Sequence, residues 1–346
     1  MMRKKKLITV ILVGVIFAIT MLVSTYALAS EEVIKLRFAT PYSLKHPMTV
    51  ADLRFIEKIE KETKGRVKIT MFPGGVLMKS RATWGGMAKG VADLGVAAAS
   101  YEKTGFDLFK GYRLFSYGMP SWQVSRKVHD KLWATFPEIP AQYAKNKMLA
   151  KSFLNPYHLF TSKKAVKNIE GFKGLQLKAV PEFVAPLKQL GAVGMVVPMS
   201  EVYIALQKNT VDGMLGPYET LKSFKLAEVV KYVTRINITR GHYSNRAMNW
   251  DTWKRLPPDV QKIIEENGDW WGREIDMELE KTDEIALGMA KKLGVQFFDL
   301  TPGDLAKFYK AIESEALKKA KALDAAGMPG TKVFKEVRRL IKEYSK

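Results

Sequence analysis

The segment from residue 174 to residue 217 alternates between strand and helix patterns within a short span of chain. A strand-like run ends at Lys178, and the helical pattern after it closes at Leu190-Gly191-Ala192. A short strand then runs into Pro198, and a second helical pattern precedes Val211-Asp212-Gly213. Alternation of short apolar strands with helices of about 10–15 residues predicts βαβ units.

The same alternation is present nearer the N-terminus. Ile34, Leu36 and Phe38 alternate with basic residues, which indicates a half-buried strand, and a helix that Gly65 closes is expected after it. Further expected elements are a strand at 66–72, a helix at 81–89 and a strand at 93–98. Because the chain is longer than a typical domain of ~100–200 residues, two α/β lobes are expected.

Helices dominate the C-terminal part of the sequence. Pro257-Pro258 opens a helical pattern that continues to about Leu293, with proline in the first turn as is common. Two more helices are predicted near residues 302–325 and 332–344.

The N-terminus has the three parts of a secretory signal peptide. Residues 3–6 are basic, residues 7–23 are apolar, and Ala27-Leu28-Ala29 fits a small-x-small cleavage site. Residues 1–29 are therefore expected to be removed on export to the periplasm. An uncleaved anchor helix is the alternative, although the apolar run is at the short edge of the ~17–25 residues that span a bilayer.

The charge and the lack of cysteine narrow the possible functions. Loss of the signal peptide lowers the net charge from +21 to +17, and the basic residues are scattered along the chain without a recognisable nucleic-acid-binding motif. The charge therefore favours anionic small molecules, and no nucleic-acid partner is expected. The absence of cysteine excludes disulfides and a lipoprotein anchor on cysteine, and is compatible with an oxidising compartment.

Catalytic and metal-binding motifs are missing from the sequence. There is no G-x-S-x-G elbow, phosphate-binding loop or H-E-x-x-H pattern, and the four histidines are too dispersed to form a local metal motif. We therefore expect no enzymatic activity, no cofactor and no metal site. The fold can still bring together an acid/base pair from residues that are far apart in the sequence.

The order of several motifs resembles that of the solute-binding proteins of tripartite ATP-independent periplasmic (TRAP) transporters. These motifs include Phe72-Pro73-Gly74-Gly75, Phe160-Thr161-Ser162 and Leu256-Pro257, besides the pattern at 174–217. The resemblance covers nearly the whole mature chain. It implies a two-lobe α/β fold of the periplasmic binding protein type, with a ligand cleft between the lobes and a long helix spanning both.

The resemblance also implies a division of the chain into two lobes and a set of partners. Lobe one would comprise residues 33–155 and 244–283, and lobe two residues 156–243 and 284–346. The protein would capture a small organic anion, a carboxylic acid, by hinge closure and deliver it to TRAP membrane permease subunits. A periplasmic sensor and, from a different class, a secreted enzyme on a two-lobe scaffold are the alternatives.

Ligand contacts of the family carry over to positions in this chain. Lys178 stands where the family has its principal carboxylate-binding arginine. The other candidates are near the ends of the predicted strands and comprise His46, Ser100, Tyr101, Tyr157, His158, Gly216, Tyr218 and Glu219.

Each candidate also has a structural alternative: Lys178 could be a solvated lysine, His158 a structural histidine, and the tyrosines core aromatics. Lysine lacks the planar fork with which arginine holds a carboxylate in two hydrogen bonds. Gly216 replaces a frequent asparagine of the family and vacates volume. These two departures predict a larger or less strictly carboxylate ligand, with an aromatic or hydroxylated body beside the tyrosines.

Overall fold

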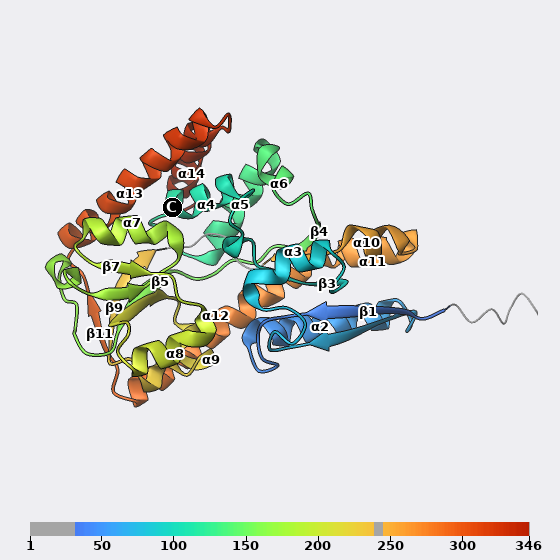
Figure 1. Cartoon of the computed structure of the whole chain (residues 1–346), viewed down its shortest axis with the longest axis horizontal. Helices are drawn as coiled ribbons and strands as arrows, with labels where there is room; N and C mark the ends of the chain where they lie inside the picture. The colour runs from blue at the N-terminus through green and yellow to red at the C-terminus, as the bar shows by residue number, and fades with distance from the viewer. Residues whose placement is uncertain (1–31, 239–244, 346) are drawn as a thin grey trace, which may run out of the picture.

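The computed structural model describes residues 32–238 and 245–345, which form two α/β lobes side by side (Figure 1). The two-lobe α/β prediction is confirmed. The predicted signal peptide, residues 1–29, lies outside the described residues. No helix of residues 32–238 and 245–345 is long and apolar enough to cross a membrane.

Lobe one is built on a five-stranded sheet with the order β2-β1-β3-β10-β4. Strand β1 is parallel to β2 and β3, whereas β10 is antiparallel to β3 and β4. The strands are β1 (Ile34–Ala39), β2 (Val67–Phe72), β3 (Leu94–Ala97), β4 (Lys147–Ala150) and β10 (Asn245–Met248). Helices belonging to this part are α2 (Pro47–Glu62), α3 (Thr83–Ala88), α10 (Trp250–Arg255) and α11 (Pro258–Glu266).

Lobe two is built on a six-stranded sheet with the order β11-β9-β5-β8-β6-β7. Strands β6, β7 and β8 are parallel, while β5 is antiparallel to β8 and β9. The strands are β5 (Tyr157–Thr161), β6 (Gln176–Lys178), β7 (Val193–Met195), β8 (Gly213–Gly216), β9 (Tyr232–Ile238) and β11 (Gln296–Asp299). Its helices include α7 (Pro181–Gln189), α8 (Met199–Gln207) and α9 (Glu219–Ser223).

The chain passes between the two sheets more than once. It leaves lobe one after β4, returns at β10, and crosses again along α12 (Gly268–Lys292) to reach β11. Helix α12 packs against α2 in lobe one and against α9 in lobe two, as Figure 1 shows. The predicted long helix spanning both lobes is thus confirmed.

Two close approaches hold α12 against lobe one. A Cβ added at Gly268 would lie 2.3 Å from the carbonyl oxygen of Leu149, and one added at Gly272 would lie 2.2 Å from that of Lys151. No real Cβ approaches a carbonyl so closely, so only glycine permits this contact between the helix and the β4 segment.

The helical pattern from Pro258 onward is interrupted, which the sequence analysis did not predict. Helix α11 ends and α12 begins at Asn267. The side-chain amide of Asn267 donates to the carbonyl of Ile263 at 2.9 Å and to the carboxylate of Glu62 at 2.6 Å. An asparagine that bonds the backbone of the preceding turn competes with the regular helix, and here it also ties the junction to α2.

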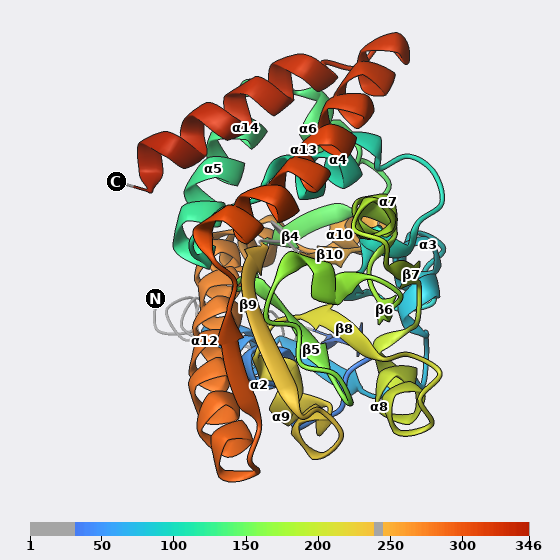
Figure 2. The same ribbon diagram turned by 90° about the vertical axis from the view of Figure 1, so that its left-hand side faces the viewer.

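The two C-terminal helices form a separate layer. Helices α13 (Pro302–Ala325) and α14 (Gly330–Tyr344) pack against α4 (Asp107–Phe115), and α14 also packs against α5 (Trp122–Thr135). Figure 2 shows this layer above the sheet of lobe two, with the short α6 (Glu138–Ala141) nearby. Helix α13 also contacts α7, so the layer touches elements from both predicted lobes. The division of the chain into lobes by residue number stays a prediction.

Candidate functional site

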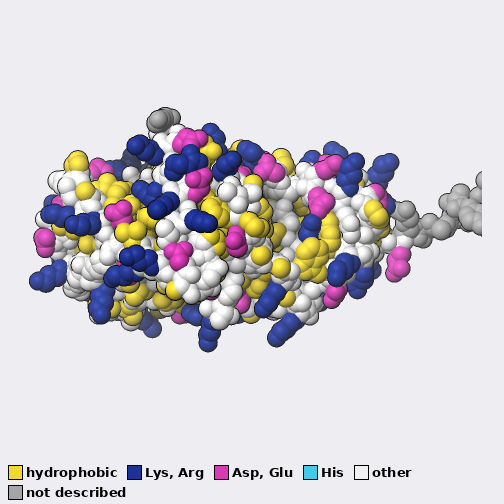
Figure 3. Space-filling view, turned by 90° about the horizontal axis from the view of Figure 1, so that it is seen from above, with side chains coloured by type: hydrophobic (Ala, Val, Ile, Leu, Met, Phe, Trp, Pro, Cys, Tyr) yellow, Lys and Arg dark blue, Asp and Glu magenta, His cyan; other side chains and the backbone are white. Residues whose placement is uncertain are grey.

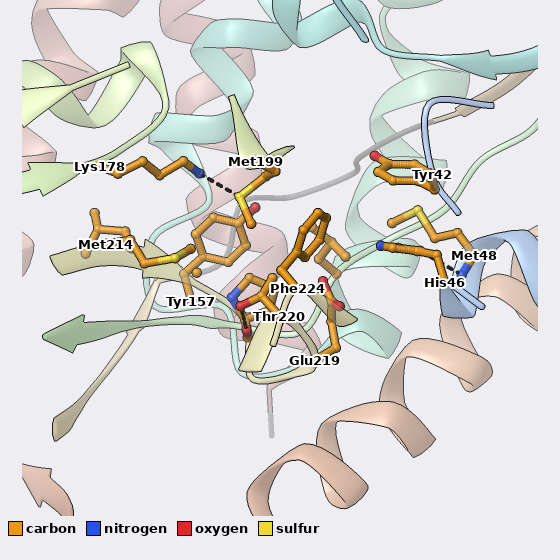
Figure 4. A pocket seen from close by; sticks show the side chains of 14 residues that line it. Tyr42, His46, Met48, Tyr157, Lys178, Met199, Met214, Glu219, Thr220 and Phe224 are labelled. Carbon is orange, nitrogen blue, oxygen red and sulfur yellow. Dashed lines mark hydrogen bonds between the residues drawn. The ribbon is translucent and has the colours of Figure 1, made fainter. Parts of the chain in front are cut away.

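A pocket lies where the two lobes meet, and residues from both of them line it (Figure 4). It contains about 350 Å³ of empty space, part of it open to solvent. Its lining residues are Tyr42, His46 and Met48 from lobe one, Leu154 between the sheets, and Tyr157, Lys178, Met199, Met214, Leu215, Gly216, Pro217, Glu219, Thr220 and Phe224 from lobe two.

Strand direction explains why these residues meet. Because β6 and β8 are parallel and β5 is antiparallel to β8, the ends of β6 and β8 and the start of β5 share one edge of the sheet. That edge carries Lys178, Gly216 and Tyr157. The loop after β1 approaches it from the other lobe and carries His46. Binding sites of open α/β sheets commonly form at such strand ends.

His46 is held as a neutral side chain that offers one N–H to the pocket. Its Nδ1 caps α2 by accepting from the backbone N–H of Met48 at 3.2 Å. Burial, with a further contribution from the charge of Arg246, lowers the pKa of His46 to about 3. The hydrogen of the neutral ring therefore resides on Nε2, and Figure 4 shows this nitrogen pointing into the pocket.

Aromatic rings from both lobes form the wall around His46. The Tyr42 ring stacks on the His46 ring with 4.2 Å between centroids, and Phe224 meets His46 edge to face at 5.6 Å. Figure 4 shows Phe224 standing between the lobe-one residues and Tyr157. These rings offer flat apolar surface with few polar atoms, which suits a planar or apolar ligand body.

Lys178 provides a cation within the pocket. Only 5% of the residue is exposed, and its Nζ donates to the thioether sulfur of Met199 at 3.2 Å. A thioether is a weak acceptor, so an anionic oxygen would be a much stronger partner for the ammonium. A single lysine can therefore provide the main electrostatic attraction for an anion here.

Glu219 places a carboxyl group in the same pocket. The residue is 4% exposed, and Ser223 Oγ donates to its Oε2. Its backbone N–H donates to Asp283 on α12. Burial and, to a smaller extent, the nearby Asp283 together raise the pKa of Glu219 to about 8, against the opposing effect of the Ser223 hydrogen bond. The side chain is accordingly neutral near pH 7.

His158 and Tyr218 do not line the pocket. Neighbouring residues of a strand point to opposite faces, so His158 faces away from Tyr157. The His158 and Tyr218 rings stack with 4.1 Å between centroids. Burial, with the charge of Arg235, lowers the pKa of His158 to about 3. Burial also raises the pKa of Tyr218 to about 12, although the charge of Arg235 opposes this shift. This pair lies behind the pocket edge, on the side of the sheet that carries Arg235.

Tyr101 lies in a different, more open groove. The Arg81 guanidinium is 5.9 Å from the centre of the Tyr101 ring, and Pro181 and Val196 of lobe two line the opposite part of this groove. Ser100 belongs to the same short 3₁₀ turn, and its side chain lies outside what the structure describes. The structure thus brings His46, Tyr157, Lys178, Gly216 and Glu219 together, but not Tyr101, His158 or Tyr218.

Several pocket residues were not found by the sequence analysis. Tyr42 could have been suspected because it precedes His46 in the loop after β1. Met199 follows Pro198 at the start of α8, where a strand end was expected. Phe224 had no local signal, because it closes a short helix and reaches the pocket only through the packing of the two lobes.

On the face drawn in Figure 3, lysine and arginine side chains are interspersed with acidic ones. Among residues 32–238 and 245–345, no three or more His, Cys, Asp or Glu side chains are grouped so that they could hold a metal ion.

Comparison with known proteins identifies the family of this chain. A family model described as bacterial extracellular solute-binding protein, family 7, matches residues 38–322. The C4-dicarboxylate-binding periplasmic protein DctP of Rhodobacter capsulatus is 27% identical over 310 residues, which cover 85% of this chain and 88% of that protein.

Solved structures agree with the sequence comparison. A TRAP periplasmic solute binding protein from Desulfovibrio salexigens has a TM-score of 0.74 at 26% identity and covers 90% of this chain and 96% of that one. A marine metagenome TRAP solute binding protein, specific for aromatic acid ligands and crystallised with 3-hydroxybenzoate, has a TM-score of 0.81 at 23% identity and covers 91% and 99%. This chain therefore belongs to family 7 of the bacterial extracellular solute-binding proteins, the solute-binding proteins of TRAP transporters.

Proposed function

We propose that this protein captures a small organic acid in the pocket between its lobes and delivers it to the membrane permease subunits of a TRAP transporter. It does so in the periplasm after removal of residues 1–29. It acts as a carrier and releases its ligand chemically unchanged. The observation that carries this proposal is the meeting of the buried Lys178 with aromatic residues of both lobes around one pocket.

The ligand's carboxylate is proposed to pair with Lys178. His46 Nε2–H donates to another ligand oxygen, while Tyr42, Tyr157 and Phe224 enclose the body of the ligand. The sequence-based expectation that Gly216 vacates volume is wrong, because the methyl group of Met214 fills the space where a Cβ would lie. His158 and Tyr218 support this edge from behind, and Tyr101 lines the neighbouring groove.

An aromatic or hydroxylated monocarboxylate suits this pocket better than a small dicarboxylate. The apolar rings and methionines provide much more surface than cations, and a single lysine satisfies a single carboxylate. The marine protein's ligand, 3-hydroxybenzoate, has this chemistry, and the Rhodobacter relative takes C4-dicarboxylates. These two acid classes are therefore the informative probes.

Ligand contact with both lobes implies closure. A ligand that touches residues of both lobes is bound better by the closed state and shifts the population toward it. The ligand-bound protein should then have a smaller radius of gyration than the ligand-free protein in small-angle scattering.

The test begins with the purified mature protein. Any bound acid is released by denaturation and identified by mass spectrometry, and the refolded protein is titrated calorimetrically with 3-hydroxybenzoate and succinate. We expect a carboxylic acid to bind one to one and to be recovered unchanged. Turnover of the acid would favour a secreted enzyme, and failure of every organic acid tested to bind would contradict the proposal.

A further inference from the structure

Glu219 is an unexpected residue in a pocket for an anion. Its carboxyl group lines the same pocket as Lys178, yet among the described residues it forms no ion pair with a basic side chain. The hydrogen bond that it accepts comes from the hydroxyl group of Ser223, which is uncharged. Because Glu219 is buried, its ionised form would repel a ligand carboxylate in the pocket.

The surroundings of Glu219 include a second buried carboxyl group. Asp283 accepts from the backbone N–H of Glu219 and from the side-chain amide of Asn155, the latter at 2.6 Å. Two buried carboxyl groups so close together disfavour ionisation of both. Burial, with a smaller contribution from the charge of Glu280, also raises the pKa of Asp283 to about 7. Helix α12 thus places a second buried carboxyl group behind Glu219.

The other groups that face Glu219 do not cancel the repulsion that an ionised Glu219 would exert on a ligand carboxylate. Across the pocket lie the neutral His46, the phenols of Tyr42 and Tyr157, and the ammonium of Lys178. On α9 itself Lys222 is exposed, and Glu228 of the following turn accepts from Tyr203 at 2.9 Å. Lys178 is the pocket's basic side chain among the described residues, and a bound carboxylate would engage it.

We propose that Glu219 enters the complex as a neutral carboxylic acid and donates its O–H to an oxygen of the organic acid, so that ligand binding requires a proton on this residue. This rests on the proposed function. The pocket then presents three donors from three elements, namely Lys178, His46 and Glu219. Such a set selects an anion that carries a further acceptor oxygen, and it makes binding weaken as the pH rises.

The direction of this pH dependence follows from the protonation state that binds. Because the pKa of Glu219 is raised to about 8, the acid is intact below that pH and is lost above it. The affinity should be nearly constant from about pH 6 to about pH 7 and should fall by up to about tenfold per pH unit above the pKa. The carboxylate of 3-hydroxybenzoate stays ionised throughout this range, so the ligand's own charge does not cause the fall.

Infrared difference spectroscopy tests the protonation state without any ligand. The ligand-free protein near pH 7 should show the carbonyl stretch of a protonated carboxylic acid that Glu219→Gln lacks, and this band should disappear as the pH rises. No difference between the two proteins in this region would overturn the inference, whatever the ligand proves to be.

Calorimetric titration with 3-hydroxybenzoate tests the consequence for binding. Glu219→Gln keeps a hydrogen-bond donor but has no proton to lose, so its affinity should vary much less with pH than that of the wild type. Ser223→Ala removes the hydrogen bond that favours the ionised form, so the wild-type fall should move to higher pH. Parallel pH profiles in all three proteins would contradict the inference while leaving the proposed function intact. Absence of binding of any organic acid would instead contradict the proposed function.

Discussion

The ring of His46 in lobe one meets the ring of Phe224 in lobe two edge to face, with 5.6 Å between the ring centroids. The two residues are far apart in the sequence, and each is positioned by its own lobe: His46 caps α2, and Phe224 closes α9. Their contact therefore exists only while the lobes are together. It links the geometry of the pocket wall directly to closure.

Phe224→Ala should weaken ligand binding and reduce closure. An aromatic pair contributes ~0.5–1.5 kcal/mol beyond its buried area, so we expect an affinity loss of roughly three- to tenfold. Calorimetry measures the affinity, and small-angle scattering at saturation should show a larger radius of gyration than that of the wild type. Phe298→Ala, which removes a partly buried ring from β11 outside the pocket, is the matched control. Equal effects of the two substitutions would argue against a role for the His46–Phe224 contact.

Lys178→Ala should cause the largest loss of binding. Removing one partner of a buried charge pair costs ~2–5 kcal/mol, so the affinity should fall by roughly thirtyfold or more. Lys208→Ala changes an exposed lysine of the same lobe and should leave the affinity within about fivefold of the wild type. Calorimetric titration with the native ligand distinguishes these outcomes.

Lys178→Arg tests whether the pocket is built around the compact ammonium group. The wider guanidinium should impair binding of the native ligand and favour simple carboxylates, which it can hold in two parallel hydrogen bonds. Near-normal affinity of Lys178→Ala for the native ligand would mean that Lys178 does not contact it.

Gly272→Ala should destabilise the junction between α12 and lobe one. The added Cβ would lie 2.2 Å from the carbonyl oxygen of Lys151, so the backbone must shift, and we expect a loss of roughly 1–3 kcal/mol in the free energy of unfolding. Gly288 lies on the same helix with no atom within 4 Å of an added Cβ. Gly288→Ala should therefore gain up to ~1 kcal/mol from helix propensity. Urea unfolding measures both changes in the free energy of unfolding. If both substitutions changed it in the same direction, the close approach would be unimportant.

The stability of the ligand-free protein should fall as the pH rises through the range of the buried carboxyl groups. The pKa of Glu219 is raised from 4.5 to about 8, so the folded state holds this proton more tightly than the unfolded state does. The resulting stabilisation is fully present below about pH 4.5 and is lost as the pH rises toward about 8. Glu219→Gln should show a smaller decline of the melting temperature across this window. An identical slope in both proteins would mean that Glu219 ionises normally.

Export should remove the first 29 residues. Cleavage after Ala29 would leave Ser30 as the first residue of a periplasmic product, because Ala27-Leu28-Ala29 fits the signal-peptidase pattern. Intact-mass measurement of the protein from the periplasmic fraction checks this. A chain that begins at Met1 or Met2 and remains with the membrane fraction would instead support an anchor helix.

Local pattern was sufficient for most of the individual elements. The alternation at residues 34–38 and 66–72 predicted β1 and β2, and the order of motifs from 174 to 217 predicted β6, α7, β7 and α8. These patterns depend on which residues are buried on one face of a strand or helix, and this periodicity can be seen in residues close together in the sequence. The same order of motifs pointed to the family.

The orientation of side chains toward the pocket was harder to predict from the sequence. Tyr157 and His158 are adjacent, and alternation tells only that they face opposite sides of β5. Whether the ligand side is that of Tyr157 depends on how lobe one docks. The break at Asn267 also depends on a distant partner, Glu62, whose carboxylate accepts from the Asn267 amide.

By itself the sequence determined the α/β class, the strands and helices at residues 34–98 and 174–207, and the position of Lys178 at the end of a strand. Only the tertiary structure decided that Phe224 meets His46, that Asp283 lies behind Glu219, and that Tyr101 stands in a separate groove. The physical reason is that periodicity records burial within one element, whereas the pocket arises where two lobes and a crossing helix come together. Its chemistry, a cation beside a neutral acid, depends on burial that residues far apart in the chain impose on one another.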